Sequence, residues 1–110
     1  MELYHYTFNA NRESITNNGL RNIFGLIFFT TDGEQVEPSV KHYSQTMIRV
    51  SVELTDEYEK ITDLLKTEYN LVSSYFNPEL IHLIGADISK WYVIRRDLKP
   101  EEIIEIKEMF

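Results

Sequence analysis

The chain of 110 residues contains no cysteine, so disulfide bonds, thiolate catalysis and cysteine-ligated zinc or iron–sulfur centres are excluded. Glycine is scarce, and no glycine-rich phosphate-binding loop occurs, which leaves a Rossmann or P-loop nucleotide fold unsupported. No apolar run approaches the roughly 20 residues of a membrane span, and the first residues lack the pattern of a signal peptide. We therefore expect a soluble cytoplasmic protein with no membrane partner.

Basic residues are outnumbered by acidic ones, 11 against 18, and the net charge is −7. Affinity for duplex nucleic acid depends on Lys and Arg side chains that neutralise phosphates, so direct duplex binding is not expected. Arg95 and Arg96 form the one local basic cluster. Either they bind a phosphate or they lie on a solvated strand edge. The acidity favours solubility, or attraction to a basic protein partner.

The size and the apolar content predict one domain over residues 1–110 with a hydrophobic core. Residues 2–7 alternate in the manner of a strand, with Leu3, His5 and Thr7 on one face. The remaining expected elements are a helix capped by Asn9 or Asn11 that ends at Gly19, a buried strand over 26–30, a half-exposed strand over 47–54, a helix that begins at 55–57, and strands over 80–84, 91–95 and 101–106. This order predicts an α+β fold with a mostly antiparallel sheet and two or three helices packed on it.

His5 is the first candidate for chemistry. A neutral imidazole donates a hydrogen bond from one ring nitrogen and accepts one at the other. Such a side chain can hold a ribose hydroxyl in a fixed orientation, or it can be a structural histidine bonded within the sheet. No short spacing relates His5, His42 and His82, so no metal site is expected.

Three segments together resemble the start of small proteins of the ADP-ribosyltransferase superfamily. They are Leu3-Tyr4-His5-Tyr6-Thr7, a short helix that ends at Asn18-Gly19-Leu20, and Gly25-Leu26-Ile27-Phe28-Phe29-Thr30-Thr31. The resemblance is to the histidine-bearing branch related to diphtheria toxin, the poly-ADP-ribose polymerases and the DarT-type toxins. It implies a split β-sheet and NAD as the substrate. In that branch the first-strand histidine binds the NAD ribose, the backbone of the next residue holds the nicotinamide amide, an aromatic ring stacks on the nicotinamide, and a late carboxylate stabilises the cationic sugar.

Carried over to this chain, the resemblance implies that His5 binds the ribose and that the backbone of Tyr6 meets the carboxamide. Tyr43 is the stacking aromatic only by its order along the chain. The full set of expected NAD-binding residues is His5, Tyr6, Thr7, Phe29, Thr30, Thr31 and Tyr43.

The resemblance implies that the late carboxylate is Glu79, which opens the predicted strand after Pro78, or alternatively Glu102. Cleavage of the nicotinamide–ribose bond builds positive charge on the sugar, and a fixed carboxylate stabilises that charge most in the transition state. Electrostatic contributions of this kind are worth roughly 3–4 kcal/mol in known sites. His5 and Glu79 are therefore the expected catalytic residues.

The sequence thus predicts a small NAD-binding protein that transfers ADP-ribose to an unknown macromolecular or small-molecule acceptor. The alternative is a non-catalytic, acidic inhibitor or interaction protein, of a phage or toxin–antitoxin type, on a degenerate version of the same scaffold. A sugar-nucleotide hydrolase with two catalytic carboxylates is a third possibility, and it requires Glu79 and Glu102 to face one another.

Overall fold

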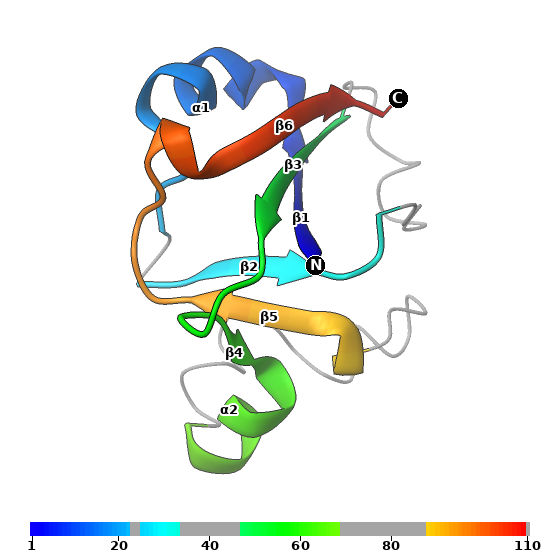
Figure 1. Cartoon of the computed structure of the whole chain (residues 1–110), viewed down its shortest axis with the longest axis vertical. Coiled ribbons are helices and arrows are strands. Elements are labelled where there is room, and N and C mark those ends of the chain that lie inside the picture. The colour runs from blue at the N-terminus through cyan, green and yellow to red at the C-terminus, as the bar shows by residue number, and fades with distance from the viewer. Residues whose placement is uncertain (23–24, 34–46, 69–87, 110) are drawn as a thin grey trace.

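The computed structural model describes residues 1–22, 25–33, 47–68 and 88–109 (Figure 1). The predicted strand over 80–84 and the candidates Glu79, Tyr43, His42 and His82 lie outside these residues. The described elements confirm the α+β prediction, since two helices accompany a six-stranded antiparallel sheet. The strands are β1 Glu2–Phe8, β2 Ile27–Thr30, β3 Met47–Glu53, β4 Glu59–Lys60, β5 Trp91–Ile94 and β6 Ile103–Glu108, and the helices are α1 Arg12–Asn18 and α2 Ile61–Thr67.

The strand order in the sheet is β4-β5-β2-β1-β3-β6, and each neighbouring pair is antiparallel. β1 pairs with β3 along its whole length, from Glu2 opposite Glu53 to Phe8 opposite Met47. Between β1 and β2, by contrast, the described register contains one pair, Tyr4 opposite Thr30. Figure 1 shows the consequence, because β2 and β5 run in a different direction from β1, β3 and β6. The sheet therefore consists of two halves that meet at β1 and β2.

Helix α1 confirms the prediction of a short helix that begins after Asn11 and ends at Gly19, but the predicted side-chain cap is absent. A 3-10 turn, η1 Asn9–Asn11, precedes α1, and neither Asn9 nor Asn11 caps the helix through its side chain. Instead, the Asn11 amide donates to Thr7 Oγ1 at 2.9 Å. The backbone of Asn11 is helical, with φ −89° and ψ −5°, whereas a residue that caps a helix through its side chain is typically extended.

Gly19 ends α1 for two physical reasons. Its φ of +80° lies in the region that favours glycine. A Cβ atom at this position would also lie 1.8 Å from the Leu98 carbonyl oxygen. The close approach exists because Leu20 and Leu98 exchange backbone hydrogen bonds of 3.0 and 2.8 Å. One glycine therefore both terminates the helix and lets two distant segments pair.

Strand β3 was expected to expose one face, which is confirmed at Glu53 but wrong at Ser51. Ile48, Val50 and Val52 are buried as predicted, but Ser51 on the other face is also buried, with 1% of its surface exposed. The alternation of polar and apolar residues identified the strand correctly. It could not reveal that Ser51 is flanked on its own face by the two residues opposite it, Tyr4 of β1 and Glu105 of β6.

The helix predicted from residues 55–57 begins later, at Ile61. Thr55 makes a turn instead, because its carbonyl accepts from Tyr58 N–H at 3.3 Å and its hydroxyl accepts from Glu57 N–H at 3.4 Å. Glu59 and Lys60 then pair with β5. Strand pairing with a distant segment thus replaces the first turns of the expected helix.

Two groups of apolar side chains form the described core. The larger one lies between the sheet and α1 and includes Leu3, Ile15, Phe29 and Val50. The smaller one joins α2 to β5 through Ile61, Leu64 and Val93, which confirms that the Ile61–Leu65 stripe is core. At the C-terminal end, η4 Pro100–Glu102 is a 3-10 turn, so the last strand starts at Ile103. None of the helices in the described ranges is long and apolar enough to cross a membrane.

Candidate functional site

The candidate site lies where β1 meets β2, and we call it the β1–β2 junction; it comprises His5, Tyr6, Phe28, Phe29 and Thr30. The alternation of hydrogen-bonded pairs between β1 and β3 determines which backbone groups of β1 point toward β2. Leu54 N–H donates to Met1 O at 2.8 Å, and the register continues from there through Leu3 opposite Val52. Hydrogen-bonded pairs alternate in an antiparallel ladder, so the backbone groups of Tyr4 and Tyr6 are turned toward β2.

The His5 imidazole links the two halves of the sheet. Its Nδ1 lies 2.8 Å from the carbonyl oxygen of Phe28. A carbonyl can only accept, so Nδ1 carries the proton. In the neutral ring Nε2 is then the unprotonated nitrogen, which can accept a hydrogen bond. The fold therefore selects one tautomer of His5 through a contact that lies beyond the last registered β1–β2 pair.

The surroundings of His5 keep its ring neutral. The ring lies 5.7 Å from the ring of Phe29, which is fully buried and in turn packs edge-on against Tyr58 at 5.3 Å. Burial lowers the pKa of His5 below its usual 6.5, and the hydrogen bond to Phe28 offsets this only in part. At neutral pH the side chain thus presents an acceptor rather than a cation.

Tyr6 and Arg49 anchor the segment that follows β2. The Tyr6 hydroxyl donates to Asp32 O at 2.8 Å, and Arg49 Nη1 donates to Gly33 O at 2.6 Å. The Arg49 guanidinium also lies over the Tyr4 ring, 4.7 Å from its centroid. Sequence reasoning missed Arg49, because residues 47–53 contain no aromatic side chain and the cation–π contact with Tyr4 depends on the pairing of β3 with β1.

The threonines predicted for the site are not gathered around the imidazole. Thr7 shares the face of His5, but its hydroxyl accepts the hydrogen bond from Asn11. Thr30 lies opposite Tyr4 and hence on the other face of the sheet from His5. Its hydroxyl accepts from Asp32 N–H at 3.2 Å. Thr31 N–H donates to Lys90 O at 3.0 Å. The structure brings Phe29 to His5, whereas the Thr30 hydroxyl serves the turn after β2.

Glu102, the alternative late carboxylate, belongs to a different group of charges. We call this group the arginine cluster; it comprises Arg95, Arg96, Glu57, Glu59, Glu68 and Glu102. Arg96 binds Glu102 at 2.7 and 3.0 Å and Glu57 at 2.8 and 2.9 Å. The two bonds from Arg96 to Glu102, together with the one from Lys99 N–H, lower the pKa of Glu102 to about 2. No described hydrogen bond joins Glu102 to the β1–β2 junction.

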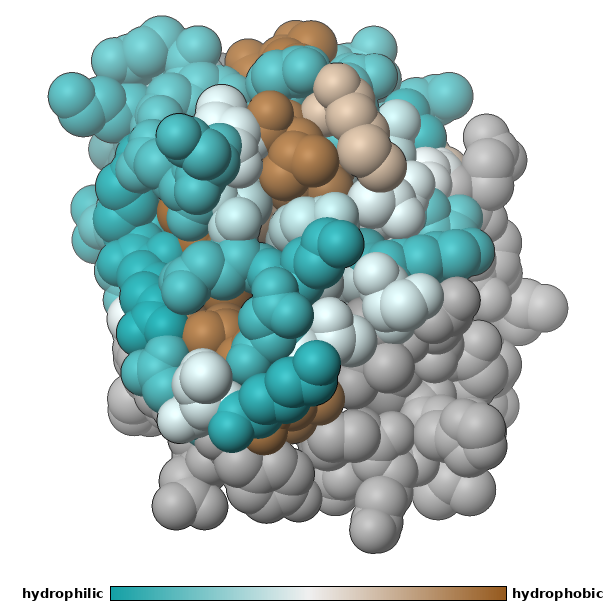
Figure 2. Space-filling view, turned by 60° about the horizontal axis from the view of Figure 1, so that its bottom comes forward, coloured by the Kyte–Doolittle hydropathy of each residue, from teal (hydrophilic) through white to brown (hydrophobic). Residues whose placement is uncertain are grey.

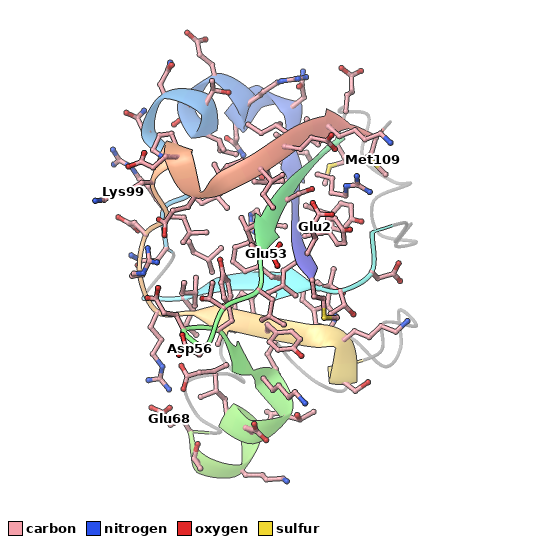
Figure 3. The ribbon with its side chains drawn as sticks, viewed as in Figure 1. Glu2, Glu53, Asp56, Glu68, Lys99 and Met109 are labelled. Carbon is pink, nitrogen blue, oxygen red and sulfur yellow. The ribbon has the colours of Figure 1, made fainter. Side chains whose placement is uncertain are left out.

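Arg95 occupies the other half of the cluster. It binds Glu59 at 2.6 Å through Nε and also pairs with Glu68 at the end of α2. Figure 3 shows Glu68 on the same side of the ribbon as Asp56 and the exit of β5. Each arginine is thus held by two carboxylates. In this structure the guanidinium donors of Arg95 and Arg96, which were candidates for binding a phosphate, are directed at glutamates.

Comparisons with known proteins add no assignment, since no protein-family model and no curated protein matches the chain. The chemistry of the junction therefore rests on its own geometry. A neutral imidazole of defined tautomer, next to a strand position whose backbone is turned to the same side, can bind and orient a hydroxyl-bearing ligand.

Proposed function

We propose that the protein is a small NAD-binding, ADP-ribosyltransferase-like protein that transfers ADP-ribose to an acceptor. The observation that carries the proposal is the His5 imidazole, held by the Phe28 carbonyl at 2.8 Å at the meeting point of the two sheet halves. A neutral ring with Nε2 as acceptor suits a ribose hydroxyl, which is a donor. This fit, together with the resemblance of residues 3–31, supports NAD as the substrate.

The roles follow from the chemistry of glycosidic cleavage. NAD supplies the ADP-ribosyl group and nicotinamide as the leaving group. His5 would accept a hydrogen bond from a ribose hydroxyl and fix the sugar, while the Tyr6 backbone, on the side turned toward β2, would meet the carboxamide. Glu79 would stabilise the positive charge on the sugar as the nicotinamide–ribose bond breaks. The acceptor nucleophile then forms the new bond to the same sugar carbon and releases its proton to water.

The binding step is tested by isothermal titration of NAD into three proteins. His5→Asn places an amide N–H close to the position of Nδ1 and so can keep the bond to Phe28 O, but it removes Nε2. His5→Ala removes both. We expect the wild type to bind NAD, and both variants to lose about tenfold or more in affinity, which corresponds to roughly 1.4 kcal/mol. A folded His5→Asn that binds NAD as tightly as the wild type contradicts the assignment of His5.

The transfer step is tested by nicotinamide release, with lysate proteins and nucleic acids supplied as acceptors. Glu79→Gln keeps the side-chain shape and removes the charge, so we expect it to retain NAD binding and lose turnover by about 100-fold or more. Glu102→Gln is the matched comparison, and it should retain turnover because Glu102 is bound by Arg96. Absence of release by the wild type with every acceptor would count against an enzyme.

A second candidate is a non-catalytic interaction protein that binds a basic partner. The observation in its favour is the arginine cluster, in which four glutamates engage both arginines of the only basic pair. The cluster therefore leaves the acidic surface without a basic patch at this place, and Figure 2 shows a largely hydrophilic described surface from one side. A stoichiometric, salt-sensitive complex with the basic protein cytochrome c, unchanged by Glu79→Gln, would support this function.

A further inference from the structure

Strand β6 is an edge of the sheet among the described strands. Met109 N–H donates to Met47 O at 2.9 Å, and the register runs on from there through Arg49 opposite Lys107. Because hydrogen-bonded pairs alternate, Lys107 directs its backbone groups at β3, whereas those of Ile106 and Glu108 point away from the sheet. A contact on that outer side agrees with this phase, since Arg12 Nη2 lies 3.5 Å from Ile106 O.

A groove of about 270 Å³ runs beside this edge, between β6 and α1. Its floor and walls include Ile15 and Thr16 of α1 and Ile103 and Ile106 of β6. Ile104 lies at the irregularity in the β3–β6 register and is 55% exposed, which is unusual for a large apolar residue here. Figure 1 shows α1 facing β6 across this side of the molecule. An exposed sheet edge is a setting in which proteins accept an additional strand.

The sequence of β6 is complementary to itself in one symmetric register. An antiparallel pair of β6 strands centred on Glu105 would set two Glu105 side chains opposite each other, and a pair centred on Lys107 would do the same with two lysines. A pair centred on Ile106 instead sets Glu105 opposite Lys107 of the second copy, twice. In this register the two Ile106 residues form a hydrogen-bonded pair, which agrees with the backbone groups of Ile106 pointing away from β3.

We propose that β6 pairs with β6 of a second copy of this chain, antiparallel and centred on Ile106, to give a symmetric dimer with a continuous sheet. Two Glu105–Lys107 pairs define the register, and the exposed Ile104 of each copy is covered at the interface. Arg12 is displaced from Ile106 O, which costs little because the contact is long and exposed. One strand pair buries less than the roughly 1,200 Å² of a standard interface, so the dimer is weak and is observed at high concentration.

Sedimentation velocity over a concentration series tests the dimer and its register. Lys107→Glu should weaken the wild-type dimer roughly tenfold, because two like-charged pairs replace two opposite pairs. Glu105→Lys, which also removes the long 3.5 Å ion pair of Glu105 with Arg49 Nη2 of its own chain, should do the same, and the double variant Glu105→Lys/Lys107→Glu should restore dimerisation. Lys66→Glu, the same charge change on exposed α2, is the control and should have no effect. Thermal unfolding of each variant shows that the monomer remains folded.

Cross-linking tests the register directly, because the chain has no cysteine of its own. Glu105→Cys and Lys107→Cys proteins are mixed under mild oxidation. The proposed register places position 105 opposite position 107, so the mixture should form disulfide-linked dimers several-fold faster than either protein alone. A wild type that stays monomeric at high concentration overturns the proposal. A dimer that Lys107→Glu leaves intact, or that cross-links no faster in the mixture, overturns it as well.

Discussion

The β1–β2 junction and the arginine cluster connect distant segments by opposite means. At the junction a hydrogen bond from the partly buried His5 imidazole adds to the Tyr4–Thr30 pair between β1 and β2, and the imidazole packs against the fully buried ring of Phe29. In the cluster two arginines bind four glutamates, but their side chains are roughly 30–50% exposed. Exposed ion pairs contribute little each, since water and salt screen them. The number of bonds is therefore a poor guide, and we expect the junction to matter more for stability.

The largest effect is expected from Phe29→Ala, which removes the ring that packs against both His5 and Tyr58. Loss of a fully buried phenylalanine costs about 3–5 kcal/mol in free energy of unfolding. Water that enters the space should also move the pKa of His5 back toward 6.5. Urea unfolding and an NMR titration of the His5 ring measure the two effects. If stability falls by less than 1 kcal/mol, the junction is not the stronger connection.

His5→Ala is expected to cost about 1–2 kcal/mol, because the partly buried Phe28 carbonyl loses its donor. His5→Asn should recover most of that loss, since its amide can donate to the same oxygen. Chemical unfolding of the two variants beside the wild type measures the difference. Equal stability of His5→Ala and wild type would show that the bond does not hold the sheet halves together.

The two regions should lose their contributions to folding stability in different pH ranges as the solution is acidified. His5 has a lowered pKa in the folded protein, so stability is full above 6.5 and is lost as pH falls through that value toward the folded pKa. Glu102 has an ordinary value of 4.5 and a folded value of about 2, so its contribution is lost only between these two. With one third of its side chain exposed, we expect about 1 kcal/mol from Glu102.

Unfolding free energies measured from pH 8 to pH 2.5 should therefore show two separate declines. His5→Asn should remove the upper one, and Glu102→Gln should reduce the lower one. Arg96→Gln serves as the control for the second, because it removes the donor that lowers the pKa of both Glu102 and Glu57. A single decline that neither variant changes would contradict the separation.

The smallest effect is expected from Arg95→Gln. Arg95 makes four contacts with Glu59 and Glu68, yet all three side chains are about 40% exposed. We expect a loss of no more than about 0.5–1 kcal/mol, and less in 1 M salt. Thermal unfolding at low and high salt measures it. A loss as large as that of Phe29→Ala would reverse the comparison on which these predictions rest.

Much of the architecture could be predicted because local patterns suffice for it. The alternation in residues 2–7 and the glycine at position 19 mark β1 and the end of α1 whatever surrounds them. The prediction failed at residues 55–60, where the sequence favours a helix start but Glu59 pairs with β5 instead. It failed again at Ser51, which is polar but covered. In both places contacts with distant residues outweighed the local preference.

The candidate site shows the same division. The residue type of His5 and its place in an aromatic strand were visible in the sequence, and so was the chemistry open to an imidazole. The sequence did not show which group binds His5 Nδ1 or on which face of the sheet Thr30 lies. It also did not show that Arg96 binds Glu102. The role of Arg49 beside Tyr4 was not visible either. All of them depend on strands that are far apart in the chain.

By itself the sequence determined which residues can carry charge, donate or accept, that residues 2–7 form a strand, and that the first helix ends at Gly19. The tertiary structure decided which tautomer of His5 exists, which carboxylates are engaged by arginine and which strand forms an edge. The physical reason is one of range. Conformational preference acts over a few residues, whereas burial and hydrogen-bond pairing depend on whatever the fold brings alongside.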